Sequence, residues 1–172
     1  AHRLGAQNPN SYTGPDVGLF PVGYGSGSQD VIIPAFIAAY TGRDASKVAL
    51  SPFPALPMPN WRFTYSGLSK LPAFKNFLKN LTISHGYTST YSVGSFISNI
   101  EYAEQNGFQS AFDFNFNFIS KYQIDGIVIT EQFSPLINFD MTWNNSLLSR
   151  FEIKKSRNLA LSFVNNQVTE IA

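Results

Sequence analysis

The chain offers few side chains that could perform chemistry. It has two histidines, His2 and His85, and no cysteine, so thiolate metal sites and disulfides are excluded. His85 lies between Ile83 and Tyr87 in an alternating segment, which favours a packed or interfacial ring over a metal ligand. No paired-histidine motif occurs, and no nucleophile elbow recommends a serine for a catalytic triad.

Two further motifs fail on closer reading. The stretch DFNFN at 113–117 starts like a calcium loop, but Phe118 stands where the loop needs glycine and Ile124 where it needs glutamate. The stretch GYGSGS at 23–28 lacks the Lys-Ser/Thr end of a phosphate-binding loop. We therefore expect no enzyme, no cofactor and no metal, and turn to the elements themselves.

Two long segments alternate between apolar and polar side chains, which predicts strands with two different faces. One runs from Leu81 to Ser95 and the other from Ile127 to Trp143. Soluble strands are usually about 5–6 residues long, whereas a strand that crosses a membrane needs about 9–11. The even face of 81–95 contains only Ser, Thr and Gly, which is typical of the lumen wall of a wide barrel.

This pattern assigns side chains to two environments. Those predicted to face lipid are Leu81, Ile83, Tyr87, Tyr91, Val93, Ile137, Phe139, Met141, Trp143, Phe151 and Ile153. Those predicted to face the lumen are Ser84, Gly86, Thr88, Thr90, Ser92, Asn138 and Asp140.

The composition agrees with such a wall. Charged residues make up 13% of the 172 residues, about half the usual share of about 25%, and aromatic residues make up 15%. Mean hydropathy is only −0.07, and no stretch approaches the roughly 18 apolar residues of a transmembrane helix. A net charge of +1 favours neither nucleic acid nor an acidic substrate. An aromatic-rich secreted β-domain fits the composition almost as well.

The chain divides by pattern into two parts. Residues 1–60 predict an irregular insert with a short helix at 30–41, capped by Ser28 or Asp30 and ended by Gly42, followed by a proline-rich linker. The helix presents a stripe of Ile32, Phe36 and Tyr40, with Ile33 and Ile37 beside it. At about 18 Å the helix is too short to span a bilayer. Residues 61–172 predict antiparallel transmembrane strands and loops. Within them NIEYAEQNGFQS at 99–110 is predicted to be a loop, and FDFNFNF at 112–118 alternates without a clear role.

A hairpin is predicted at residues 144–146. A three-residue loop pairs Trp143 with Leu147 and Phe139 with Phe151, and keeps both apolar rows on one face. The same register continues to Pro135 opposite Lys155, Phe133 opposite Arg157 and Glu131 opposite Leu159. Alternatively, KKSRN at 154–158 is itself a turn and the chain makes two short hairpins.

Four long stretches resemble a known family. They are NPNSYTGPDVGLFPVGYGSGSQDVIIPAFIAAYTG, SPFPALPMPNWRFTYSGLSKLP, GYTSTYSVGSF and ITEQFSPLINFDMTWNNSLLSRFEIKKSRNLALSFVNNQVTE. The chain resembles an internal segment of the SprA/Sov family, the very large outer-membrane translocon of the type 9 secretion system. Residues 102–120 carry the least of this resemblance.

The resemblance implies a fold, a place and partners. The fold is all-β with a short helix, a segment of a very large antiparallel transmembrane β-barrel in the bacterial outer membrane. The implied function is export of protein cargo, with a role in gliding motility. Implied partners are the remainder of the same barrel chain, a smaller outer-membrane barrel, a periplasmic plug protein and membrane lipid. The alternative is a stand-alone β-rich surface domain for binding or adhesion.

Overall fold

The computed structural model describes residues 1–12, 18–53, 58–165 and 167–172. The chain forms two compact units, and neither is one continuous segment. The helix-bearing unit comprises Ala1–Ala55, Val93–Gly126 and Leu161–Asn166, and the sheet unit comprises Leu56–Ser92, Ile127–Ala160 and Gln167–Ala172. The predicted proline-rich linker lies partly outside the described residues.

The helix-bearing unit has α2 (Gln29–Thr41) as its main helix, beside α1 (His2–Gln7) and the short turn η1 (Ala45–Lys47). The predicted helix at 30–41 is confirmed, with Ser28 at its start and Gly42 in the left-handed conformation at its end. The buried stripe is Ile33, Phe36 and Ile37, whereas Ile32 and Tyr40 are only partly buried. The buried face is thus centred on the residues that were expected beside the stripe. Positions 33, 36 and 37 follow the i, i+3, i+4 spacing of one helix face.

The side chain of Gln29 ties α2 to strand β6 (Tyr122–Ile124), which pairs with β3 (Phe96–Ser98). Its Nε2 donates to the carbonyl of Tyr122 (2.8 Å), and its Oε1 accepts from the backbone N–H of Ile124 (3.0 Å). Within the described part of the chain, no helix combines the length and hydropathy that a membrane crossing requires.

Residues 104–109 form a small hairpin that the sequence reading missed. Strands β4 (Glu104–Gln105) and β5 (Phe108–Gln109) pair across Asn106 and Gly107, which have φ angles of 54° and 83°. Two left-handed residues in a two-residue loop are typical of a type I′ turn, for which Asn-Gly is the preferred sequence. The prediction of a loop here was therefore wrong, and the Asn-Gly pair was the available signal.

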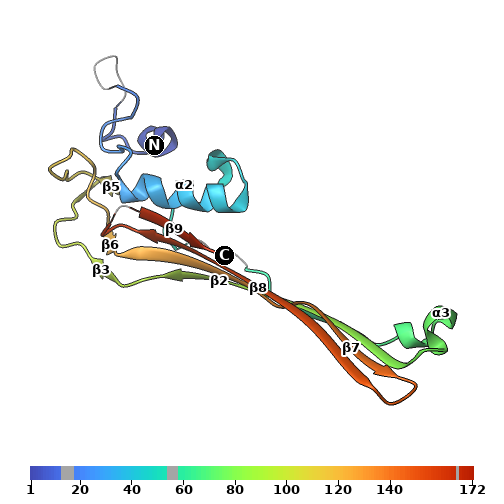
Figure 1. Ribbon diagram of the computed structural model, residues 1–172. Coiled ribbons are helices and arrows are strands. Elements are labelled where there is room, and N and C mark those ends of the chain that lie inside the picture. Colours follow the sequence, from blue (N-terminus) through green and yellow to red (C-terminus); the bar gives the residue numbers. More distant parts are fainter. Residues whose placement is uncertain (13–17, 54–57, 166) are drawn as a thin grey trace. The chain divides into compact units, whose positions relative to one another are not determined.

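The sheet unit is built on a mostly antiparallel sheet in the order β1-β2-β7-β8-β9. Figure 1 labels β2, β7, β8 and β9 of this sheet. Its strands are β1 (Trp61–Tyr65), β2 (Leu78–Val93), β7 (Gly126–Trp143), β8 (Leu148–Ser162) and β9 (Gln167–Ile171). The turns η2 (Leu68–Lys70) and α3 (Pro72–Lys75) connect β1 to β2. The all-β class with few short helices is thus confirmed, and three strands have 15 to 18 residues.

The β7–β8 hairpin turns as the sequence predicts. The N–H of Trp143 donates to the carbonyl of Leu147 (2.9 Å), and Ser146 takes the left-handed conformation with φ 65°. The rings of Phe139 and Phe151 lie 6.4 Å apart, as the predicted pairing requires. Strand β8 runs unbroken through KKSRN, so the alternative of a turn at 154–158 is excluded.

Farther along the same hairpin the predicted register is wrong by two residues. The N–H of Phe163 donates to the carbonyl of Asp125 (3.0 Å), whereas the predicted register places Phe163 opposite Ile127. Two cross-strand pairs, Phe139 with Phe151 and Asp125 with Phe163, bound the same stretch of the hairpin. Between them β7 advances 139 − 125 = 14 residues, whereas β8 advances only 163 − 151 = 12. Glu131 accordingly contacts Arg157 (3.7 Å) and not Leu159.

The physical reason is a local irregularity that sequence alternation does not reveal. Two extra residues in β7 leave the parity of its side chains intact, because strands have a period of two. The interval contains Leu136, whose carbonyl accepts a hydrogen bond from His85 Nδ1 (2.6 Å), a contact that a regular ladder lacks. The assignment of faces therefore survives the shift.

Cross-strand cysteines test the hairpin register. A Phe139→Cys, Phe151→Cys double variant is expected to form a disulfide readily under mild oxidation, because both side chains lie on one face at paired positions. The matched Phe139→Cys, Arg150→Cys variant is expected to remain reduced, since Arg150 points to the other face toward Asp140. Thiol titration and mass spectrometry measure the difference, and preferential linking of 139 to 150 would refute the three-residue loop.

Candidate functional site: the two faces of the sheet

One face of the sheet is aromatic and apolar; we call it the aromatic face. Pairing of β1 with β2 sets Trp61 opposite Tyr87, Phe63 opposite His85 and Tyr65 opposite Ile83. The rings of Trp61 and Tyr87 lie 4.5 Å apart, and Tyr87 and Phe133 lie 4.8 Å apart. The aromatic cluster thus extends across β1, β2 and β7.

This face is uncovered along β1 and at the start of β8, whereas Ile127, Ile129 and Leu161, farther along its apolar rows, are buried. The side chains of Trp61, Phe63 and Phe151 are 48%, 56% and 52% exposed, and Tyr65 and Ile153 are exposed as well. A water-soluble monomer rarely presents a continuous apolar surface of this kind. The aromatic face is therefore a surface that requires a partner or an apolar medium.

The eleven predicted lipid-facing residues differ in their exposure. Phe151 and Ile153 are exposed, whereas Ile83, Tyr91, Val93, Ile137, Phe139, Met141 and Trp143 are partly buried. Leu81 and Tyr87 are buried within the chain. Tyr87 is covered because its ring packs between Trp61 and Phe133 while its hydroxyl donates to Glu131 (2.6 Å).

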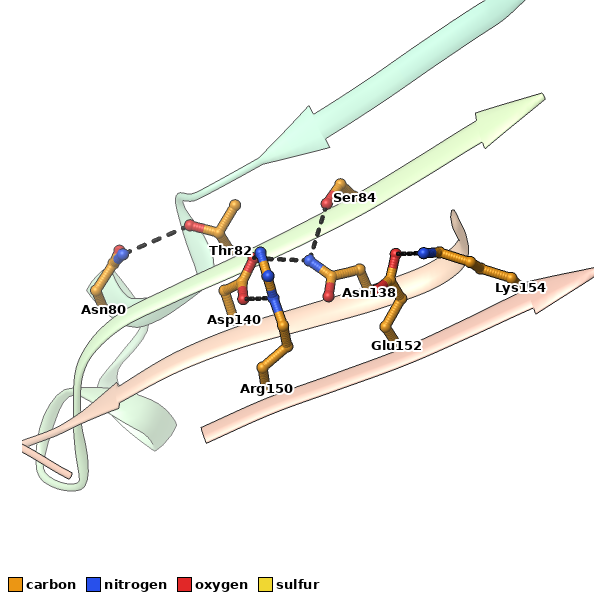
Figure 2. A network of polar contacts seen from close by, with 8 residues as sticks. All are labelled: Asn80, Thr82, Ser84, Asn138, Asp140, Arg150, Glu152 and Lys154. Atoms are coloured by element: carbon orange, nitrogen blue, oxygen red, sulfur yellow. Dashed lines mark hydrogen bonds and ion pairs between the residues drawn. The ribbon is translucent and has the colours of Figure 1, made fainter. Parts of the chain in front are cut away.

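The opposite face is polar and holds a connected network (Figure 2); we call it the polar face. Asn138 Nδ2 donates to Asp140 Oδ2 (2.7 Å) and to Ser84 Oγ (3.2 Å). Arg150 Nε donates to Asp140 Oδ1 (2.6 Å), and Lys154 Nζ lies 3.4 Å from Glu152 Oε1. Arg150 with Asp140 and Lys154 with Glu152 thus form ion pairs on this face.

The structure brings together the predicted lumen-facing residues Ser84, Asn138 and Asp140. Thr88, Thr90 and Ser92 are exposed, and Gly86 is buried where a Cβ atom would come within 2.9 Å of the carbonyl oxygen of Ser134. Sequence reasoning did not assign Arg62, Thr64, Arg150, Glu152 or Lys154 to this face. The sequence did contain this information. The alternation of WRFTY puts Arg62 and Thr64 opposite the aromatic row, and the three-residue loop puts Arg150, Glu152 and Lys154 on the polar face.

The polar face is hollowed by a cavity of about 230 Å³. Its lining includes Arg62, Thr64, Ser84, Asn138, Asp140, Arg150 and Glu152. These groups donate and accept hydrogen bonds, but no thiol or imidazole lies among them, and His85 belongs to the aromatic face. Within the described residues no group of three or more acidic or histidine side chains could hold a metal ion.

No family model matches the chain, and no curated protein matches it.

Proposed function

We propose that the sheet unit is part of the wall of a protein-conducting channel in the bacterial outer membrane. The aromatic face contacts lipid, and the polar face lines the conduit. The observation that carries this proposal is the exposed aromatic face, with a polar face on the other side of the same strands.

Energetics support this division of faces. Removing a large apolar side chain from water stabilises a protein by about 1.5–3 kcal/mol, so a bilayer would stabilise the aromatic face substantially. A charged side chain on the lipid face would cost about 2–4 kcal/mol at the midplane. The ion pairs of Arg150 and Lys154 lie on the polar face, where water is available. The aromatic face carries one charged level, where Arg157 pairs with Glu131, and this level would lie at or beyond the membrane interface.

Strand length supports it as well. Strands β2, β7 and β8 have 16, 18 and 15 residues, beyond the about 9–11 that cross a bilayer. The strands would then extend out of the membrane and form a wall taller than it. The edge strands β1 and β9 would pair with further strands of the same large barrel.

The resemblance to the SprA/Sov translocon gives this channel its biological setting. Its role would be protein export by type 9 secretion, with gliding motility as an associated process. The proposed partners are a smaller outer-membrane barrel, a periplasmic plug protein and the exported cargo. The polar face would meet the cargo.

Tryptophan fluorescence tests the lipid contact, because the chain has two tryptophans, Trp61 and Trp143, and we assign both to the aromatic face. In vesicles of brominated lipid their emission is expected to be strongly quenched, and the aqueous quencher acrylamide is expected to have little effect. Trp61→Phe and Trp143→Phe variants report each position separately. Efficient acrylamide quenching in a chain that is monodisperse without detergent would refute the channel and favour a surface binding or adhesion domain.

A further inference from the structure

The segment FDFNFNF forms a tight turn that presents two phenylalanines at its apex. Phe114 is fully exposed and Phe116 is 78% exposed. Below them the rings of Phe112 and Phe118 stack at 4.5 Å, and Phe118 is buried. The alternation therefore places Phe112 and Phe118 at the base of the turn and Phe114 and Phe116 at its exposed apex.

The turn is held by the side chain of Asp113. Its Oδ1 accepts from the backbone N–H groups of Asn115 and Asn117, both at 2.8 Å, and its carbonyl accepts from the N–H of Phe116 (3.1 Å). Asn117 is fixed in turn, since its Oδ1 accepts from the N–H of Gly25 (2.9 Å). The two exposed rings are thus presented on a preorganised support, which lowers the entropy lost on binding.

Both the backbone and the side chain of Phe116 are unfavourable for an isolated molecule. Its φ angle of 58° lies in the left-handed region, which Gly or Asn adopts far more easily than an aromatic residue. Its ring gains no burial in return. A conformational outlier combined with an exposed aromatic side chain is typical of a binding site.

The surroundings of the apex are apolar and acidic. The turn that carries the fully exposed Ile100 and the turn that carries the two phenylalanines both line one cavity of about 340 Å³, through Asn99 and Glu101 and through Asp113 and Asn117. Residues 93–126 contain four acidic side chains, Glu101, Glu104, Asp113 and Asp125, against Lys121, so their net charge is 1 − 4 = −3. This charge disfavours an anionic lipid surface and favours a basic partner.

We propose that Phe114 and Phe116, with Ile100 beside the shared cavity, dock into an apolar pocket of a partner protein whose rim carries Lys or Arg. The two rings enter the pocket, and the acidic side chains face the basic rim. This docking site is distinct from the two faces of the sheet and does not depend on the proposed channel.

A short amphipathic peptide of leucine and lysine serves as the probe, with the matched leucine and glutamate peptide as its charge control. Binding of each labelled peptide is measured by fluorescence anisotropy, with the chain in the buffer or detergent in which it is monodisperse. The leucine-lysine peptide is expected to bind more tightly, and added salt is expected to weaken it. A Phe114→Ser, Phe116→Ser double variant is expected to lose about tenfold or more in affinity, as an interface anchor does.

A Leu19→Ser variant is the matched control, because Leu19 is an exposed apolar residue of the same unit outside the apex. It is expected to bind like the unsubstituted chain. Equal binding of both peptides, or an unchanged affinity in the double variant, would overturn the proposal. Loss of binding to zwitterionic or anionic vesicles in the double variant, without a loss for the peptide, would make the apex a membrane anchor and would also overturn it.

Discussion

An Ile83→Arg substitution is expected to impair assembly of the sheet unit in a bilayer, whereas Thr88→Arg is expected to be tolerated. Ile83 pairs with Tyr65 on the aromatic face, and Thr88 is exposed on the polar face of the same strand. An arginine on the lipid face of a barrel costs about 2–4 kcal/mol at the midplane. The cost corresponds to a loss of roughly 30-fold or more in the folded population.

Urea titration of the chain refolded into vesicles measures this difference as a change in the free energy of unfolding. Val93→Arg gives a second substitution of the odd row, and Ser84→Arg a second of the polar face, beside Asn138. The free energy of unfolding is expected to be lower for Ile83→Arg and Val93→Arg than for Thr88→Arg and Ser84→Arg. Equal tolerance on the two faces would refute the assignment of lipid and lumen.

A Gly23→Ala substitution is expected to destabilise the helix-bearing unit by about 2–5 kcal/mol. Gly23 has a φ angle of 84°, and a Cβ atom there would overlap the ring of Phe118, which is only 3% exposed. A left-handed conformation costs a non-glycine residue about 1–2 kcal/mol, and overpacking in a filled core costs about 1–3 kcal/mol. Phe118 cannot move aside freely, because its N–H is bonded to the carbonyl of Gly23 (2.8 Å).

Substitutions at two other glycines of the same unit distinguish the cost of the left-handed backbone from the cost of the clash with Phe118. Gly42 has a φ angle of 64° with no atom within 4 Å of a Cβ, so Gly42→Ala is expected to cost only the about 1–2 kcal/mol of conformational strain. Gly27 is equally open and has no positive φ, so Gly27→Ala is expected to be nearly neutral. Denaturant unfolding followed by circular dichroism gives the three values. A Gly23→Ala variant as stable as Gly42→Ala would contradict the close packing against Phe118.

Local patterns determined much of this molecule. The alternation of Leu81–Ser95 and of Ile127–Trp143 predicts long strands with two unlike faces, because side chains alternate across any strand whatever its neighbours are. The capping signals of Ser28 and Gly42 predict the ends of α2 to within one residue of those observed. The three-residue loop at 144–146 follows from the need to keep two apolar rows on one face.

Other features depend on contacts that no local pattern encodes. FDFNFNF alternates like a strand, yet it turns because the carboxylate of Asp113 bonds the backbone N–H groups of Asn115 and Asn117. Tyr87 belongs to an alternating apolar row, yet it is buried because Trp61 and Phe133 flank its ring. The turn depends on side-chain hydrogen bonds, and the burial of Tyr87 depends on residues distant in the chain. Hydrophobic periodicity contains information on neither.

The register of the β7–β8 hairpin shows where the two kinds of information separate. Pairing near the turn follows from the turn itself, so Trp143 with Leu147 and Phe139 with Phe151 are predictable from sequence. Beyond it, two extra residues in β7 shift the partner of every later residue but reverse no side chain. Parity is a local property of each strand and is determined by the sequence. Register changes at every extra residue in either strand, and the sequence pattern does not reveal such residues. Only the tertiary structure therefore decided the register.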